Sequence, residues 1–456
     1  MTASQEYKGK WWLPGKEEDK VSGVLTYIPG ETIELELIGN FAEAGQDPLT
    51  ALSQDDRVKV IYGQASDGSD ISLFDCGSTI HRTFKADFAM AKYFPRQIAI
   101  GIHIPSVDDK RFFKAVVRIP ELSYWLYPKV LEQMYLKEDN KFTAVNVKMS
   151  RLPENERIAA KTSVNNGFTI SLRRDATHNS SDLCFTTTFE QFTSLTLESR
   201  NEESLRRFYE KVVRYERFLT VATLRDVHYS ELLLFSEDSY KTIGKDNKIY
   251  NPIRFDTIFH EHENYKKIQT ANFLFNYNNM EEKYSAVLKK WYSRDSKFDA
   301  IRGHFLEAID YNGHFSYMNF LTVIQAIEGY GWRYRKDAAK ATANIRCEKA
   351  KKKGTKNPCK EITLADIITS LVDEFKDVSC INKRINVSAV TDSRNYYSHL
   401  TEKTKKHKLD GEKLFDLTNE LRKILLCCVL SYLGFANQEI EIMTRDCNHS
   451  LIKGYK

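Results

Sequence analysis

The sequence predicts an α+β fold in which a β-rich N-terminal sheet or sandwich domain precedes an all-α helical bundle. Up to about residue 200, short segments alternate apolar and polar residues, which is the period of a half-buried strand. In most of the chain beyond that residue, apolar residues recur every three or four positions, which is the period of an amphipathic helix. The length of 456 residues suits two or three domains. We therefore expect a β-rich domain over residues 1–266 and a helical domain over 267–456.

Strands in the N-terminal half are predicted from alternation and from turn residues. Residues 33–37 (IELEL) alternate apolar and acidic side chains and follow a Pro-Gly turn. Residues 58–62 and 71–74 flank an Asp-Gly turn. The segment 185–197 (FTTTFEQFTSLTL) is rich in β-branched and aromatic residues, which favour strands. These segments together indicate an antiparallel sheet.

Helices are predicted from apolar stripes and from capping residues. Helical spacing begins after Asn201, whose side chain is suited to an N-cap, and a second helical region begins near Met280. Thr363 and Asp366 have the spacing of a capping box. Four or five helices with one apolar face each are expected to close as an up-and-down bundle. The stripes lie at 205–213, 280–291, 320–327, 364–375 and 414–425.

Composition and cysteine spacing exclude several classes of protein. The hydrophobic fraction of 42% and the charged fraction of 28% are typical of a soluble globular protein. No apolar run approaches the roughly 18 residues of a membrane-spanning helix, and no cleavable apolar segment begins the chain, so we expect a cytoplasmic protein. The eight cysteines form no CxxC pair, which disfavours a zinc ribbon or a disulfide scaffold. Cys427 and Cys428 are expected in the core, whereas Cys347 and Cys359, beside a lysine-rich stretch, are the ones suited to exposure.

Positive charge is concentrated in one part of the C-terminal half. The chain has a net charge of +5, but residues 333–408 hold 19 Lys and Arg against 9 Asp and Glu. The remainder of the chain is therefore net negative. A polyanion would be attracted to this stretch.

The same stretch contains the pattern R-N-x-x-x-H, formed by Arg394, Asn395 and His399. An Arg followed by a His after four to six residues occurs twice more by chance, at 173–178 and 254–260, so the following Asn and the helical context supply the specificity. In a helix, Asn395 and His399 lie one turn apart, whereas Arg394 falls on the apolar face. The alternative interpretation is a structural salt bridge from Arg394 to Glu328, with a histidine that only caps or packs.

Two basic runs bracket this motif. Residues 333–360 contain 11 basic and 2 acidic residues, and residues 401–409 (TEKTKKHKL) add four lysines. Phosphate neutralisation supplies most sequence-independent affinity for nucleic acid. A solvated or disordered loop is the alternative for each run. The RNA-contacting residues we expect are Arg333, Arg335, Lys351, Lys352, Lys353, Lys405 and Lys406.

Arginine and histidine together suit RNA cleavage without a metal. Histidine titrates near neutral pH, so it can accept a proton from a ribose 2′-hydroxyl and donate one to a leaving 5′-oxygen. Arginine stays charged and presents a planar fork of donors to phosphate oxygens. The expected products are a 2′,3′-cyclic phosphate and a 5′-hydroxyl, and DNA should resist.

The C-terminal half with its RNxxxH motif resembles the HEPN ribonucleases, and the whole arrangement, including the start Trp-Trp-Leu-Pro-Gly at 11–15, resembles the ApeA class of anti-phage proteins. The resemblance implies that Arg394 contacts the scissile phosphate, that His399 donates and accepts protons, and that Asn395 orients the pair, with Glu328 holding Arg394. It also implies a homodimer or higher homo-oligomer with a composite cleft, no cofactor, and host RNA such as transfer RNA as the target in abortive infection. The N-terminal domain would sense a phage component.

Two other functions stay open. The helical domain could be a non-catalytic HEPN-like module that binds RNA, dimerises or signals, and a complete RNxxxH set argues against this. A metal-dependent nuclease could use the tract 260–263 (HEHE), although a polar interdomain loop is the simpler interpretation. Tyr396 and Tyr397 have the chemistry to stack on bases, but the register of Tyr397 favours the core.

Overall fold

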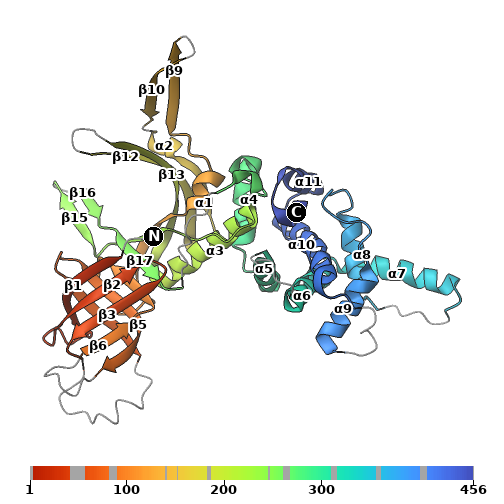
Figure 1. The fold of residues 1–456 in the computed structure, drawn as a ribbon, viewed down its shortest axis with the longest axis horizontal. Helices are drawn as coiled ribbons and strands as arrows, with labels where there is room; N and C mark the ends of the chain where they lie inside the picture. The colour runs from red at the N-terminus through yellow and green to blue at the C-terminus, as the bar shows by residue number, and fades with distance from the viewer. Residues whose placement is uncertain are drawn as a thin grey trace. The chain divides into compact units, whose positions relative to one another are not determined.

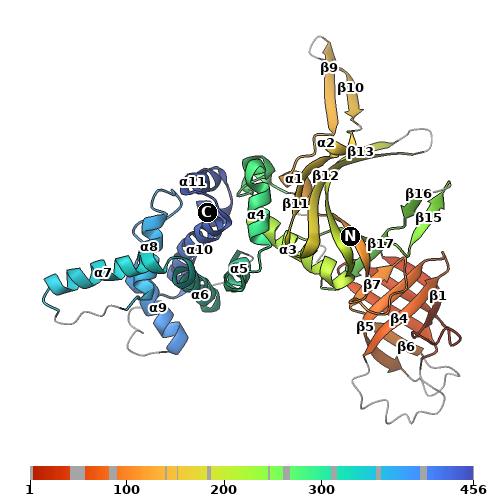
Figure 2. The same cartoon turned by 180° about the vertical axis from the view of Figure 1, so that it is seen from behind.

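The computed structural model describes residues 4–41, 57–81, 90–138, 141–150, 152–181, 186–244, 247–259, 268–309, 316–355, 361–400 and 408–454. The chain divides into two compact units (Figures 1 and 2). The first comprises Met1–Glu216 and Val227–Ile268, and the second comprises Arg217–Asp226 and Gln269–Lys456. The strands belong to the first unit and most helices to the second, so the predicted fold class is confirmed. The predicted boundary at residue 266 lies outside the described residues.

The first unit begins with a closed β-barrel. Its strands follow the order β5-β4-β1-β2-β3-β6, and β6 pairs again with β5 through Thr79↔Lys92 and neighbouring pairs. The predicted strands at 33–37, 58–62 and 71–74 all lie in it. The barrel strands are β1 Gln5–Trp12, β2 Val21–Ile28, β3 Thr32–Ile38, β4 Val58–Ala65, β5 Asp70–His81 and β6 Met90–Phe94.

Trp11 shows how the barrel core is packed. Its side chain is fully buried among apolar residues of the neighbouring strands, including Leu25, Leu35 and Leu73. A Cβ added at Gly63 of β4 would lie 2.2 Å from the Trp11 ring. The indole therefore fills the space that a side chain at position 63 would occupy, and close approach of the two strands requires glycine there.

A second, curved sheet continues from the barrel. The first part of β5 pairs with β7, and the order β7-β17-β14-β8-β13-β12-β11 completes a sheet of thirteen strands. Short helices α1 Pro120–Trp125 and α2 Glu154–Arg157 and two hairpins, β9 Leu131–Glu138 with β10 Lys141–Met149 and β15 Tyr240–Ile243 with β16 Asn247–Tyr250, extend from it. The other strands are β7 Gln97–Ile100, β8 Lys110–Arg118, β11 Ile158–Ser163, β12 Phe168–Ser180, β13 Thr187–Ser204, β14 Glu231–Ser236 and β17 Ile253–Thr257.

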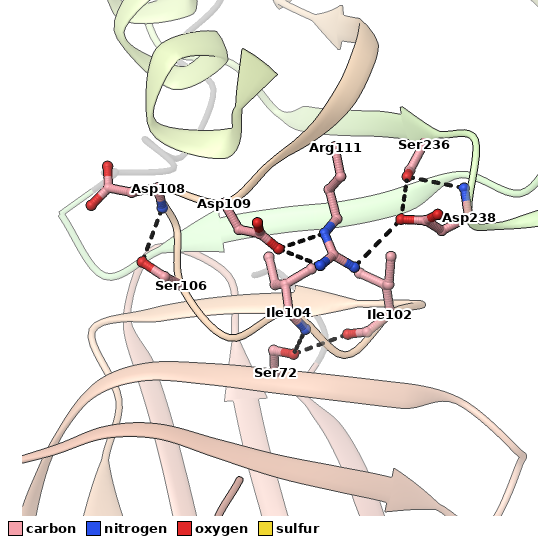
Figure 3. Close-up of polar contacts among 9 residues, drawn as sticks. All are labelled: Ser72, Ile102, Ile104, Ser106, Asp108, Asp109, Arg111, Ser236 and Asp238. Carbon is pink, nitrogen blue, oxygen red and sulfur yellow. Dashed lines mark hydrogen bonds and ion pairs between the residues drawn. The ribbon is translucent and has the colours of Figure 1, made fainter. Parts of the chain in front are cut away.

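Polar side chains fasten the barrel to this second sheet (Figure 3). The buried Ser72 hydroxyl of β5 donates to the Ile102 carbonyl and accepts from the Ile104 amide, both at 3.0 Å. Nearby, the Arg111 guanidinium on β8 binds Asp109 at 2.8 Å and reaches Asp238 at 3.5 Å. The segment that leaves the barrel is thus anchored at both of its ends.

The helix predicted to start at Asn201 begins later, and the prediction of an Asn201 cap is wrong. Strand β13 runs through Asn201 to Ser204, and α3 spans Leu205–Thr223. Glu203 and Ser204 pair with β8 beyond an irregularity in the ladder. The Ser204 hydroxyl instead accepts from the Arg207 amide at 3.3 Å, as an N-cap does. Ladder pairing with β8 outweighs the local capping preference of Asn.

The second unit has nine α-helices among its described residues from position 269 onward, more than the four or five stripes predicted. Helices α6 and α10 are central, since each contacts the other and α5. The capping box of Thr363 and Asp366 is confirmed, and Cys427 and Cys428 are fully buried as predicted. The helices are α4 Tyr284–Trp291, α5 Ser296–Ile309, α6 Tyr317–Tyr334, α7 Lys336–Lys352, α8 Leu364–Glu374, α9 Val387–His399, α10 Gly411–Leu433, α11 Asn437–Asp446 and α12 Ser450–Lys453.

Most of the basic stretch 333–360 is helix α7 rather than a loop. Ala339, Ala343 and Cys347 form its single buried face, four residues apart, and α7 packs on α8 through small side chains. Cys347 is therefore buried, contrary to the exposure that the sequence suggested. Arg346 binds Asp366 of α8 with two hydrogen bonds of 2.9 and 3.0 Å.

Asp366→Asn is expected to loosen α7. The Asp366 side chain is 2% exposed, and burial would raise its pKa, but hydrogen bonds from Arg346 and Thr363 outweigh burial and hold the pKa below 3.8. Removing this charge should cost about 1–3 kcal/mol of stability in the helical unit. Because folding lowers the pKa of Asp366, its contribution to stability is fully present above pH 3.8, the ordinary pKa of an aspartate. This contribution is lost as the pH falls through the lower pKa of the folded state. Hydrogen exchange of α7 amides should accelerate in Asp366→Asn, and unchanged exchange would contradict this role. The control is Asp373→Asn, which removes an exposed carboxylate from α8, the helix that also carries Asp366.

Candidate active site

Helix α9 carries the RNxxxH motif, and the local sequence determines both of its ends. The Asn386 side chain caps the helix by accepting from the Ala389 amide at 3.0 Å. The helix ends at His399, where Leu400 adopts a left-handed conformation with φ of +49°. Ala389, Val390 and Ser393 form the buried face, and the helix packs against α6 and α8. The motif residues after Ser393 are left at least partly exposed.

The structure brings Arg394 together with two of the predicted site residues. Its Nη2 atom lies 3.4 Å from Oε2 of Glu328 on α6, and its Nη1 donates to Asn395 Oδ1 at 3.3 Å. The side chains of Arg394 and Glu328 are 31% and 29% exposed. Both distances exceed the 2.7–2.9 Å of a tight charge-assisted bond. The guanidinium is thus oriented but weakly held, and solvent reaches it.

His399 is exposed and lies at the last position of α9. Within the described ranges its imidazole has no hydrogen bond, and the Arg394 guanidinium binds Glu328 and Asn395 rather than His399. Five positions separate Arg394 from His399, or about 140° around the helix axis. The Arg394 guanidinium donates a hydrogen bond to Asn395, and Asn395 lies one helical turn before His399 on the same face. Asn395 therefore lies between the side of the helix that carries Arg394 and the side that carries His399.

The chain returns to α9 at Leu409, whose backbone is held by two residues of the helix. Its amide donates to the buried Ser393 hydroxyl, and its carbonyl accepts from the Tyr397 hydroxyl, both at 2.9 Å. Tyr397 also stacks on Tyr317 of α6 with ring centroids 5.4 Å apart. Tyr397 therefore serves packing, as its register suggested, and burial raises its pKa despite nearby Lys408.

Lys408 lies beside the motif and was not among the residues predicted from the sequence. Its Nζ atom lies 5.0 Å from the ring centroid of Tyr396, a cation–π distance, and 3.0 Å from Asp410 Oδ2. The hydrogen bond to Asp410 raises the pKa of Lys408. Its position in the lysine run 401–409 was the available signal, but the fixed backbone of Leu409 is what places it beside the motif.

The predicted RNA contacts fall into three groups. Arg335 binds Glu374 at 2.8 Å and Ser431 at 2.9 Å, and the hydrogen bond to Glu374 raises its pKa, so this guanidinium is committed within the unit. Arg333 is exposed, with one donor on the Lys297 carbonyl at 2.7 Å. Lys351, Lys352 and Lys353 are exposed at the end of α7, whereas Lys405 and Lys406 lie outside the described residues.

The alternative metal tract at 260–263 also lies outside the described residues. Within the parts of the chain that are described, no three His, Cys, Asp or Glu side chains gather as a metal site would require. No helix in those same parts combines the length and the apolar character needed to cross a membrane.

Comparison with known families matches both halves of the chain. The model of the ApeA N-terminal domain 1 matches residues 6–291, and the Apea-like HEPN model matches residues 321–439. The second match contains Glu328 and the complete motif on α9. No curated protein and no solved structure matched the chain. Since the first model covers more than half of the sequence, the chain belongs to the ApeA family of HEPN-containing anti-phage proteins.

Proposed function

We propose that this protein is a metal-independent endoribonuclease that acts in anti-phage defence. The observation that carries the proposal is the arrangement on α9, where a weakly held, solvent-accessible Arg394 and an open His399 share one helix. The HEPN match over residues 321–439 supports an RNA substrate. An arginine needed only for structure would be expected to make tighter contacts to Glu328 than 3.4 Å.

The residues suit cleavage by the neighbouring ribose hydroxyl. Neutral His399 accepts the 2′-hydroxyl proton while the 2′-oxygen attacks phosphorus, and the bond from phosphorus to the 5′-oxygen breaks. The leaving 5′-oxygen takes a proton from an imidazolium. Arg394 donates to the phosphate oxygens as negative charge develops on them. The products are a 2′,3′-cyclic phosphate and a 5′-hydroxyl.

One helix supplies one histidine, and a homodimer would supply the second. Two α9 helices facing each other would place one His399 as base and the other as acid, with both Arg394 side chains on the phosphate. Exposure of His399 at the helix end is compatible with this arrangement. In abortive infection the target would be a host RNA, with transfer RNA the first to test, and a phage component at the N-terminal domain would trigger cleavage.

Incubation of the purified protein with total RNA in EDTA tests the proposal. We expect cleavage to persist in the chelator, the products to carry 2′,3′-cyclic phosphate and 5′-hydroxyl ends, and DNA of matched sequence to remain intact. RNA that is bound but recovered whole would instead support a non-catalytic RNA-binding module. Cleavage of DNA at a similar rate would rule out attack by the 2′-hydroxyl.

A further inference from the structure

The first unit contains a half-open cavity of about 540 Å³ beside helix α1. Its walls come from α1 and the turn that follows it, and from β13, with the end of β8 at one side. The lining mixes aromatic and proline side chains with one arginine and few other charges. The residues that the argument uses are Arg118, Tyr124, Tyr127, Glu190 and Phe192.

Two tyrosines of this lining are unusually exposed. Tyr124 is 52% exposed and Tyr127 is 57% exposed, although Trp125 and Leu126 between them are buried. The buried pair holds the segment on the sheet, so the tyrosine rings stand at the rim of the cavity. Exposed aromatic side chains grouped around a cavity are typical of binding sites.

Arg118 gives the cavity a defined polarity. Its guanidinium lies 3.9 Å above the Phe192 ring, and its Nε is 3.5 Å from Glu231. Within the described residues, its Nη1 and Nη2 atoms have no hydrogen-bonding partner. A planar guanidinium with both terminal nitrogens open is suited to a bidentate carboxylate.

The cavity is fixed by hydrogen bonds rather than formed by a loose loop. The Thr193 amide donates to the Ser123 hydroxyl at 3.0 Å, and the Thr193 hydroxyl donates to the Leu126 carbonyl at 2.9 Å. The Gln191 side chain accepts from the amides of Val130 and Leu131, both at 3.1 Å. The last contact sets the start of β9 directly beside the cavity, and a preorganised site binds with less entropic cost.

The hairpin that starts there, β9 with β10, extends away from the sheet (Figure 1) and exposes apolar side chains. Tyr135 and Val145 are register partners, so they share one face. A two-stranded hairpin alone is only marginally stable in water. A partner that covers these side chains would stabilise it. The exposed apolar residues are Met134, Tyr135, Leu136, Val145, Val147 and Met149.

We infer that the cavity and the β9–β10 hairpin form a docking site for a protein segment in which an aromatic or large aliphatic side chain is followed by a carboxylate. The apolar side chain enters between Tyr124, Tyr127 and Phe192, and the carboxylate pairs with Arg118. An RNA fits less well, because Glu190 lines the cavity and Glu231 adjoins Arg118, and these two carboxylates repel a chain of phosphates more strongly than they repel one carboxylate that is paired with Arg118. Identifying the segment as part of a phage-encoded trigger rests on the proposed function, whereas the binding chemistry does not.

The test is a library of octapeptides with a fixed central Phe-Asp, selected on the full-length protein, with a Phe-Asn library as the matched probe. We expect enrichment from the Phe-Asp library only, and the affinity of an enriched peptide should fall about tenfold or more in Arg118→Gln. Tyr127→Ser should also weaken binding. Because Tyr127 is exposed, this substitution should leave the fold intact, so weaker binding would not be due to misfolding. Arg206→Gln, which removes an exposed charge of the same unit outside the cavity, should bind as the wild type does.

Several outcomes would overturn the inference. These are no enrichment, equal enrichment from both libraries, full affinity in both Arg118→Gln and Tyr127→Ser, or displacement of the peptide by AMP. Peptide binding requires no RNA cleavage, so its failure leaves the ribonuclease proposal standing, and the absence of cleavage leaves peptide binding standing.

Discussion

RNA cleavage should fall by roughly 10³-fold or more in His399→Ala and by roughly 10²–10³-fold in Arg394→Ala. His399 is exposed at the end of α9, so alanine removes the proton carrier without opening a cavity. Among the described residues, the Arg394 guanidinium makes two side-chain contacts, of 3.3 and 3.4 Å, so its loss should affect the reaction more than the fold. Both variants should retain the unfolding profile of the wild-type protein.

Initial cleavage rates of one labelled RNA, measured with protein in excess, provide the comparison. His304→Ala on α5 and Arg445→Ala on α11 remove the same residue types from exposed or half-exposed positions of the same unit and should cleave normally. Glu328→Gln should lower the rate less than Arg394→Ala, since Glu328 only orients the guanidinium. Wild-type rates in both His399→Ala and Arg394→Ala would remove the assignment of this site.

RNA affinity should fall by up to roughly 10²-fold at about 0.1 M salt when four lysines of α7 are replaced by glutamine. Lys340, Lys349, Lys351 and Lys352 are exposed on α7, whose buried face is formed by Ala339, Ala343 and Cys347. Glutamine keeps helix propensity, so only charge is removed. The logarithm of the affinity falls with the logarithm of the salt concentration, and each lost phosphate contact should make this negative slope shallower by about 0.7 for single-stranded RNA.

Binding of a fluorescent RNA by the His399→Ala background, titrated at several salt concentrations, measures this effect without cleavage. The matched control replaces four exposed lysines of the first unit: Lys59, Lys110, Lys161 and Lys241. The α7 variant and this control variant each lose four positive charges, so their change in net charge is identical. A salt slope that falls equally in both variants would show that α7 has no particular role in RNA binding.

Local rules of the sequence predicted the helical unit well where one segment supplied all the information. The capping box at Thr363 and Asp366, the stripe on α8 and the buried Cys427 and Cys428 depend on neighbours three or four residues apart. The pairing of Arg394 with Glu328 was anticipated because a guanidinium on an apolar face needs a carboxylate. Whether that pair is structural or catalytic stays a prediction, which the cleavage rates of the Arg394 and Glu328 variants test.

Predictions failed where distant strands or helices decided the outcome. Asn201 has the chemistry of a cap, yet pairing of Glu203 and Ser204 with β8 keeps the segment in the sheet. The stretch 333–360 was predicted to contact RNA, and whether it would be ordered or a loop was left open; small residues on one face and the bond from Arg346 to Asp366 hold α7 on α8. In both cases the partner that decides the structure, strand β8 or Asp366 of α8, lies outside the local segment from which the prediction was made.

By itself the sequence determined the fold class, the RNxxxH motif and the concentration of positive charge around it, because periodicity, residue chemistry and charge are local properties. Only the tertiary structure decided that β6 closes a barrel on β5, that Leu409 brings Lys408 to the motif, and that α1 and β13 enclose a cavity around Arg118. These features join residues far apart along the chain. Their free energy comes from contacts that exist only once the chain has folded.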